Sequence, residues 1–109
     1  MLTALIGSET REQALVFIFA REKGYALEIA DFYELGVSQV QRQLDLMEAG
    51  SILVSHKIGR TRLYEFNPRL FYLAELKALL EKTLAFYPPA IQEDLTTNRR
   101  RPRRRNKPL

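Results

Sequence analysis

Residues 37–68 constrain the fold of this chain more than any other stretch, because the pattern of a short helix is followed by a glycine and then by two strand-like runs. The apolar residues Val40, Leu44 and Met47 stand at positions i, i+4 and i+7, the spacing of one buried stripe on an α-helix. This spacing predicts a helix over residues 39–49. The order of the segment predicts a helix that leads directly into a β-hairpin.

The polar side of this predicted helix differs from an ordinary solvated helix face, which is usually rich in Glu and Lys. It carries glutamines and one arginine, side chains that form hydrogen bonds with base edges in a DNA groove. Ser38 is the expected N-cap, and Gly50 stands where a left-handed residue would end the helix. We interpret this side as a DNA-reading surface, with a plain solvated face as the alternative. Its candidate DNA-binding residues are Ser38, Gln39, Gln41, Arg42 and Gln43.

Two β-prone runs, residues 51–57 and 62–66, follow this helix and predict a hairpin. The turn between them contains Gly59, which adopts positive φ without steric cost. Cations crowd the tip of the hairpin and would lie beside a phosphate backbone if the helix entered a groove. The candidate wing contacts are Lys57, Arg60 and Arg62, while His56 is interpreted as an ordinary surface residue.

Two helices are predicted before this segment. Residues 9–23 form the first, with Ser8 as its N-cap and Gly24 beyond its end. Residues 27–33 form a shorter helix, and a tight turn connects it to the helix at 39–49. Two short helices joined in this way make a helix-turn-helix.

A long helix is predicted after the hairpin, over residues 69–87, and Pro88 and Pro89 close it. It is apolar on more than one face, so it must be covered on more than one face. Either it packs entirely on its own domain, or part of it pairs with the same helix of a second subunit. We expect a homodimer, because a small core leaves little surface to cover so wide an apolar band. The predicted dimer contacts are Leu70, Leu73, Leu76, Leu80, Leu84 and Tyr87.

The charge of the chain is divided unevenly. The 109 residues carry a formal net charge of +4, but residues 1–98 hold 10 of the 17 Lys and Arg and all 13 Asp and Glu, which gives 10 − 13 = −3. Residues 98–109 are expected to be a disordered tail that either adds sequence-independent affinity for a polyanion or only solubilises the protein. The candidate DNA-binding residues of the tail are Arg99, Arg100, Arg101, Arg103, Arg104 and Arg105.

The composition excludes several classes of protein. The chain has no Cys and a single His, so we expect no disulfide, no metal site and no cofactor. It has no glycine-rich phosphate loop, no nucleophile beside a base and no spaced pair of acids, so we expect no enzyme. No apolar run approaches the roughly 20 residues of a membrane span, and the first residues lack the pattern of a signal peptide. We expect a soluble, cytoplasmic protein that is associated with the nucleoid when bound to DNA.

Short fragments along residues 2–87 match a known family through their shared order and spacing. They are Leu5-Ile6-Gly7-Ser8 with Thr10-Arg11, Glu28-Ile29-Ala30, Val40-Gln41-Arg42-Gln43-Leu44, Glu48-Ala49-Gly50, Gly59-Arg60, Tyr64, Asn67-Pro68, and Leu76-Lys77-Ala78-Leu79 with Lys82-Thr83. In these fragments the chain resembles the winged helix-turn-helix regulators of the ArsR and MarR type. It resembles more closely the small winged-helix proteins found alone or joined to minimal nucleotidyltransferase domains.

The resemblance implies a fold that is mainly α with a small β-hairpin wing, of the α+β class. Residues 1–97 would form a winged helix-turn-helix domain with a long C-terminal helix. Within it, Gln41 and Arg42 would make the base contacts. Arg60 and Arg62 would contact phosphate or the minor groove.

One residue departs from the family pattern. Glu34 stands where the family has a glycine between the two helices, and Gly36 follows two residues later. This departure leaves the start of the reading helix open.

The predicted function is a sequence-specific, double-stranded DNA-binding transcriptional regulator. It would be a homodimeric repressor that reads the major groove with helix 39–49 and contacts the backbone or minor groove with the wing at 56–62 and with the basic tail. One alternative is a protein-interaction module that partners a nucleotidyltransferase. Another is RNA binding through the Arg-rich tail.

Overall fold

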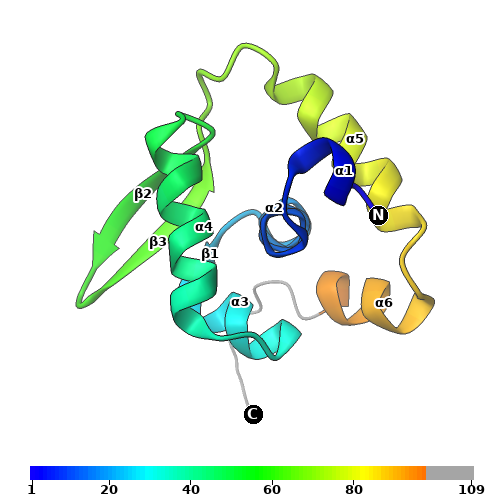
Figure 1. Cartoon of the computed structure of the whole chain (residues 1–109), viewed down its shortest axis with the longest axis horizontal. Coiled ribbons are helices and arrows are strands. Elements are labelled where there is room, and N and C mark those ends of the chain that lie inside the picture. The colour runs from blue at the N-terminus through cyan, green and yellow to red at the C-terminus, as the bar shows by residue number, and fades with distance from the viewer. Residues whose placement is uncertain (98–109) are drawn as a thin grey trace.

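The computed structural model describes residues 1–97, and the predicted tail at 98–109 lies outside the described residues. The described part is mainly helical with one small sheet, as the sequence predicts (Figure 1). Its elements are α1 (Thr3–Ile6), α2 (Glu9–Arg21), β1 (Gly24–Tyr25), α3 (Ala26–Tyr33), α4 (Val37–Ala49), β2 (Leu53–Ile58), β3 (Thr61–Phe66), α5 (Leu73–Ala85) and α6 (Pro89–Thr97).

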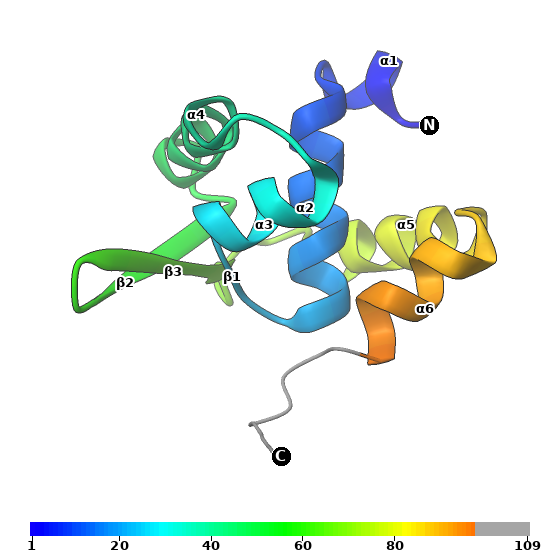
Figure 2. The same ribbon diagram turned by 90° about the horizontal axis from the view of Figure 1, so that it is seen from below.

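The three strands form one antiparallel sheet in the order β1-β3-β2. Strands β2 and β3 pair over their whole lengths, from Leu53 opposite Phe66 to Ile58 opposite Thr61. Figure 2 shows that this hairpin extends away from the helices, on the side of the molecule opposite α6. The hairpin is therefore a wing whose tip stands out from the domain.

Helix α2 forms the centre of the domain, because the other helices and the sheet pack around its apolar residues (Figure 1). Val16, Phe17 and Ile18 are completely buried. The predicted N-cap is confirmed, since the Ser8 Oγ accepts a hydrogen bond from the Arg11 N–H at 3.2 Å. Helix α2 is the scaffold against which the helix-turn-helix is placed.

Helix α4 begins two residues earlier than predicted, at Val37, because its N-cap is Gly36 rather than Ser38. Gly36 has φ −68° and ψ 135°, an extended conformation that any residue type adopts. All three residues of the predicted apolar stripe are buried, which confirms the face that packs inward. The earlier start adds one half-turn to the polar side of the helix.

Residues other than glycine take the left-handed conformation at the ends of α3 and α4. Glu34 has φ 59° and Ser51 has φ 67°. The prediction that Gly50 takes this role was wrong, since its φ is −86°. In both places the following residue, Leu35 or Ile52, donates its N–H to a carbonyl five residues back at 2.9 Å, which is the Schellman motif. Both following side chains pack against the core, so their burial decides where each helix ends.

The predicted helix at 69–87 is shorter in the structure. Helix α5 begins at Leu73, because turns precede it in which the Asn67 Oδ1 accepts a hydrogen bond from the Arg69 N–H at 3.0 Å. Leu70 lies in these turns rather than in the helix. The side chain of Asn67 therefore stabilises a turn where the apolar spacing predicts a helix.

A further helix, α6, follows where the sequence predicted only a stop. It begins at Pro89. Proline is well suited to the first helical position, because the N–H that it lacks would have no acceptor within the helix there. Its last turn is held by the buried Arg21 of α2, which donates to the carbonyls of Asp94 at 3.0 Å and Leu95 at 3.2 Å. The Leu95 side chain is completely buried. Helix α6 therefore belongs to the domain core.

Candidate nucleic-acid interface

The wing presents cations on the face of the hairpin that packs against α4. Lys57 and Arg62 are direct cross-strand neighbours on this face, and both are exposed. Two like charges opposite each other destabilise a hairpin. The Arg62 Nη1 donates to the Ser55 Oγ at 3.1 Å, whereas Lys57 has no polar partner within residues 1–97. The pair keeps positive charge at the surface, where an anionic partner would offset the repulsion.

The tip of the wing is a tight turn of Gly59 and Arg60. Gly59 has φ 63°, which confirms the predicted positive φ. Arg60 is exposed and has no polar partner in the described part of the chain. His56 lies on the other face of the hairpin, where its Nε2 is 2.8 Å from the Glu65 Oε2. The cations therefore gather on one face and at the tip.

Helix α4 turns one stripe of side chains outward. Ser38, Arg42 and Leu46 follow one another at i, i+4 and i+8, and all three are exposed. With Gln41 and Asp45 they line a shallow surface hollow of about 430 Å³. Arg42 has no polar partner within residues 1–97, so its guanidinium is available for a bidentate pair with guanine. Leu46 was missed in the sequence, because an isolated leucine on a helix is more simply interpreted as core.

Two of the candidate glutamines face α2. The Gln39 Nε2 donates to the Thr10 Oγ1 at 2.7 Å, and the Arg11 Nε donates to the Gln43 Oε1 at 2.9 Å. The two glutamines are four residues apart and therefore lie on the same side of α4. Their bonds fix α4 against the central helix, so they position the outward stripe. Their contact with DNA stays a prediction.

The third glutamine, Gln41, is bonded toward the base of the wing. Its Nε2 donates to the Tyr64 Oη at 2.8 Å and to the Asp45 Oδ1 at 2.9 Å, and the Tyr64 hydroxyl donates to the same Oδ1 at 3.2 Å. Burial raises the pKa of Tyr64, and the charge of Asp45 adds to the rise. The hydroxyl therefore keeps its proton and remains a donor at neutral pH. No sequence signal predicts the role of Tyr64, because only the packing of the wing brings it to α4.

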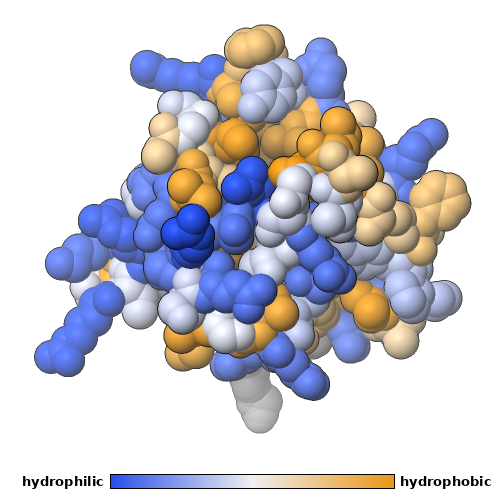
Figure 3. All heavy atoms as spheres, viewed as in Figure 1, coloured by the Kyte–Doolittle hydropathy of each residue, from blue (hydrophilic) through white to orange (hydrophobic). Residues whose placement is uncertain are grey.

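An open cleft lies between α4 and the wing. It has a volume of about 650 Å³, and its lining includes Gln41, Asp45 and Glu48 from α4 and Arg60 and Arg62 from the hairpin. Figure 3 shows hydrophilic side chains along the edge of the molecule where the wing lies, and hydrophobic surface over α1 and the neighbouring part of α5. On this face of the molecule, the edge at the wing is thus more hydrophilic than the surface over α1 and α5.

The predicted dimer residues differ in how far they are exposed. Leu80 is completely buried in the domain's own core, so its assignment to a dimer surface was wrong. Leu73, Leu76, Leu84 and Tyr87 are partly buried against the same core. An apolar groove of about 360 Å³ lies beside them; its lining includes Leu5, Ile6, Leu15, Ile52, Tyr72, Leu76 and Leu79. The most exposed apolar side chain near this groove is Phe71, at 92%.

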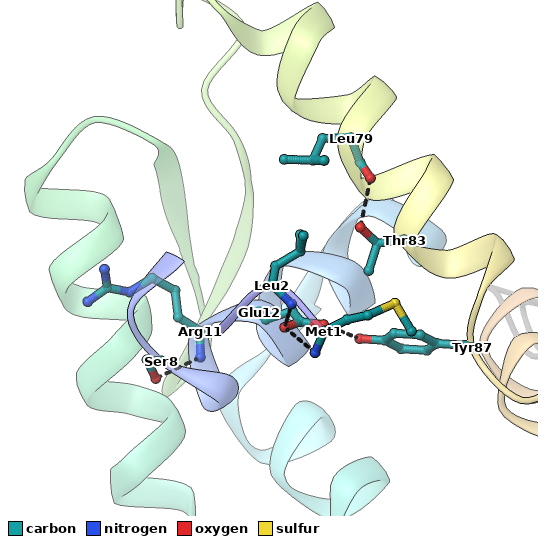
Figure 4. A network of polar contacts seen from close by, with 8 residues as sticks. All are labelled: Met1, Leu2, Ser8, Arg11, Glu12, Leu79, Thr83 and Tyr87. Atoms are coloured by element: carbon teal, nitrogen blue, oxygen red, sulfur yellow. Dashed lines mark hydrogen bonds and ion pairs between the residues drawn. The ribbon is translucent and has the colours of Figure 1, made fainter. Parts of the chain in front are cut away.

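A polar network holds the apolar side of the domain together (Figure 4). The Glu12 carboxylate is buried, and its Oε1 accepts hydrogen bonds from the Leu2 N–H at 2.6 Å and from the Met1 amine at 3.2 Å. Its Oε2 accepts a hydrogen bond from the Tyr87 hydroxyl at 3.2 Å. The network joins the residues just before α1 and just after α5 to α2, so it is part of the scaffold.

Within residues 1–97 no group of His, Cys, Asp and Glu side chains is arranged to hold a metal ion. None of the helices in that part of the chain is long and apolar enough to cross a membrane. The arginines predicted as DNA contacts in the tail lie outside the described residues.

No protein-family model matches this sequence, and no curated protein matches it. Solved structures match it in fold. Reduced HlyU from Vibrio cholerae superposes with a TM-score of 0.61 at 21% identity, over 79% of this chain and 84% of that chain. A double mutant of Lactococcus lactis ZitR in apo form gives a TM-score of 0.56 at 19% identity, over 90% of this chain and 82% of that chain. The chain therefore has the winged helix-turn-helix fold that its sequence resembles, and the predicted α+β class is confirmed.

Proposed function

We propose that this protein is a homodimeric, sequence-specific regulator of transcription that binds double-stranded DNA and represses by occupancy. The observation that carries the proposal is the open cleft between α4 and the wing. Gln41 and Asp45 line it together with Arg60 and Arg62, and the same two α4 residues also line the hollow beside Arg42. A helix in the major groove would bring Arg42 to the bases. The neighbouring wing would bring Lys57, Arg60 and Arg62 to the backbone or the minor groove. The winged helix-turn-helix fold, which ArsR- and MarR-type regulators use, supports the same function.

The dimer part of the proposal rests on the apolar side of the domain. A second copy would cover the groove beside α5 together with Leu73, Leu76, Leu84 and Tyr87. A two-fold dimer would place two α4 helices about one DNA turn apart, which predicts a palindromic site. The tail at 98–109 would add sequence-independent affinity through counterion release.

Randomised-site selection with the purified protein tests the DNA part. The selection is run at two salt concentrations, with the full chain and with a chain that ends at residue 97. We expect a palindromic site from both chains and a steeper salt dependence for the full chain. Enrichment of no DNA sequence would contradict the function. Enrichment of a single half-site would contradict the dimer, and selection of RNA by the full chain alone would favour RNA binding through the tail.

Sedimentation of a Phe71→Ser variant tests the dimer. Because Phe71 is 92% exposed, the substitution removes little from the domain's own core. We expect the dimer dissociation constant to rise about tenfold or more, since each subunit would lose the burial of one aromatic ring. Leu27→Ser on α3, where Leu27 is 60% exposed, serves as a matched control and should leave the dimer intact. An unchanged dissociation constant for Phe71→Ser would place the interface elsewhere.

No comparison places a nucleotidyltransferase beside this chain, so that partner stays a prediction from the sequence. A cytoplasmic location with association to the nucleoid follows from the proposed function.

A further inference from the structure

The side-chain amide of Gln41 is held in one orientation. An amide nitrogen carries two hydrogens. Nε2 has two acceptors within reach, the Tyr64 Oη at 2.8 Å and the Asp45 Oδ1 at 2.9 Å. The Tyr64 hydroxyl gives its own hydrogen to the same carboxylate oxygen, at 3.2 Å. The three side chains close a ring of hydrogen bonds in which each hydrogen has an acceptor.

The reverse orientation of the amide is disfavoured by its neighbours. Turning the amide over would bring its carbonyl oxygen against the Asp45 carboxylate, and an ionised carboxylate only accepts hydrogen bonds. Tyr64 is completely buried, and its one hydrogen already serves Asp45. The Gln41 Oε1 is consequently the polar atom of this side chain that has no hydrogen-bond partner within residues 1–97. Gln41 lines both the outer hollow on α4 and the cleft beside the wing, which are the surfaces that DNA would contact.

We propose that Gln41 reads DNA only as a hydrogen-bond acceptor and selects a base with an exocyclic amino group. In the major groove these are adenine, through N6, and cytosine, through N4. Guanine and thymine show no polar group but acceptors on that edge, so they would face the Gln41 carbonyl without a hydrogen between them. A glutamine with an unbonded amide would instead bind adenine in bidentate fashion. The inference rests on the proposed DNA-binding function and names what one residue of it recognises.

Asp45 and Tyr64 are positioning residues in this scheme, because they act on DNA through the Gln41 amide. Asp45 lies on the outward side of α4, where its carboxylate would repel phosphate and weaken DNA binding. Its role in fixing the Gln41 amide explains why an acid stands at this position. Tyr64 comes from β3 and thereby connects the wing to the base-reading side chain.

Site selection with three variants tests the proposal. For the wild type we expect adenine or cytosine to be preferred about tenfold over guanine or thymine at one position of the half-site, the size of one hydrogen bond. Gln41→Met should abolish this preference at that position and leave the others. Tyr64→Phe, which keeps the volume of the core, should release one amide hydrogen and admit guanine or thymine there. Gln92→Met is the matched control, because Gln92 lies on α6 and its side-chain Nε2 donates to the carbonyls of Ala85 and Tyr87.

Three results would overturn the inference. They are a Gln41-dependent position that selects guanine or thymine, a Gln41→Met variant with unchanged preferences, and a Tyr64→Phe variant that keeps the adenine or cytosine preference. Amide hydrogen exchange of the free protein separates these from failure of the proposed function. The Gln41 side-chain amide should exchange more slowly than that of Gln43, which engages its carbonyl rather than its nitrogen, and the protection should fall in Tyr64→Phe. Slow exchange without selection of any DNA overturns the function and the base reading together, while rapid exchange with a selected site overturns only the inference.

Discussion

The helix-turn-helix and the wing carry opposite charge although they border the same cleft. Residues 26–50 contain one cation and five acids, 1 − 5 = −4, whereas residues 51–66 contain three cations and one acid, 3 − 1 = +2, with His56 neutral. The five acids are Glu28, Asp31, Glu34, Asp45 and Glu48. A helix-turn-helix of this charge repels phosphate within a Debye length of about 10 Å at 0.1 M salt.

In the proposed DNA-binding function, this difference in charge gives the two regions different roles. Within residues 1–97 the side chains of Lys57 and Arg60 have no polar partner, and Arg62 donates only to the Ser55 hydroxyl. The wing would therefore supply attraction to phosphate that does not depend on sequence. Helix α4 has most of its polar side chains bonded to the rest of the domain, and it exposes Arg42 in a fixed stripe. In the proposed function, α4 would discriminate between bases while adding little attraction to phosphate. Separate substitutions in the two regions should therefore have different signatures.

The largest effect is expected from removing the wing cations. The triple variant Lys57→Ala, Arg60→Ala, Arg62→Ala should lose roughly two to three orders of magnitude in affinity at 0.1 M salt, equally on all sequences, and should lower the salt slope by about 0.9 for each phosphate contact removed. Titration of cognate and random duplexes at several salt concentrations measures both quantities.

The matched control removes the same charge from exposed cations outside the interface, at Lys23, Arg69 and Lys82. It should lower affinity far less. If the control and the wing variant lost affinity equally, the net charge of the protein alone would account for the attraction. A direct contact between the wing cations and DNA would then be contradicted.

A smaller and more selective effect is expected on α4. Arg42→Ala should cost about 1 to 3 kcal/mol on the cognate site and relax the preference at one base pair. The salt slope should stay nearly unchanged, because a base contact releases no phosphate counterion. Binding curves on the cognate site and on single-base variants provide the measurement. An equal loss of affinity on every duplex would show that Arg42 contacts the DNA backbone. Arg42 would then act in the same way as the wing cations.

The smallest effect concerns the turn that positions the acidic helix-turn-helix. Glu34→Gly should raise the free energy of unfolding by a few tenths to about 1 kcal/mol, because glycine adopts φ 59° without the steric cost that Glu pays. Gly36→Ala is the control, since Gly36 has φ −68° and nothing within 4 Å of an added Cβ. Urea unfolding measures both. A loss of stability in Glu34→Gly would show that its side chain contributes more than its backbone conformation costs.

The inward faces of the elements could be predicted from the sequence because they depend on local periodicity. The stripe of Val40, Leu44 and Met47 is buried as predicted. The Ser8 cap and the positive φ of Gly59 are also confirmed, since each depends on residues that are neighbours in the chain. From these features the sequence correctly predicted that a helix is followed directly by a hairpin.

The helix ends and part of the candidate site differed from the prediction, because they depend on contacts that local periodicity does not show. The prediction of a left-handed conformation at Gly50 was wrong, because Ser51 takes it instead. The burial of the side chain that follows the left-handed residue outweighed the preference of that conformation for glycine. The start of α5 shifted because the Asn67 side chain stabilised a turn. Leu80 was assigned to a dimer, but it is completely buried in the core of its own chain.

The sequence by itself determined the class of fold, the inward faces and the position of the wing cations, because these are set by spacing and composition over short distances. Only the tertiary structure decided which polar side chains of α4 are exposed and which are bonded to the rest of the domain. Thr10 and Arg11 of α2 bind Gln39 and Gln43, and Tyr64 of the wing takes part in holding Gln41. These partners are 23 to 32 residues away in sequence, so no local pattern could show them.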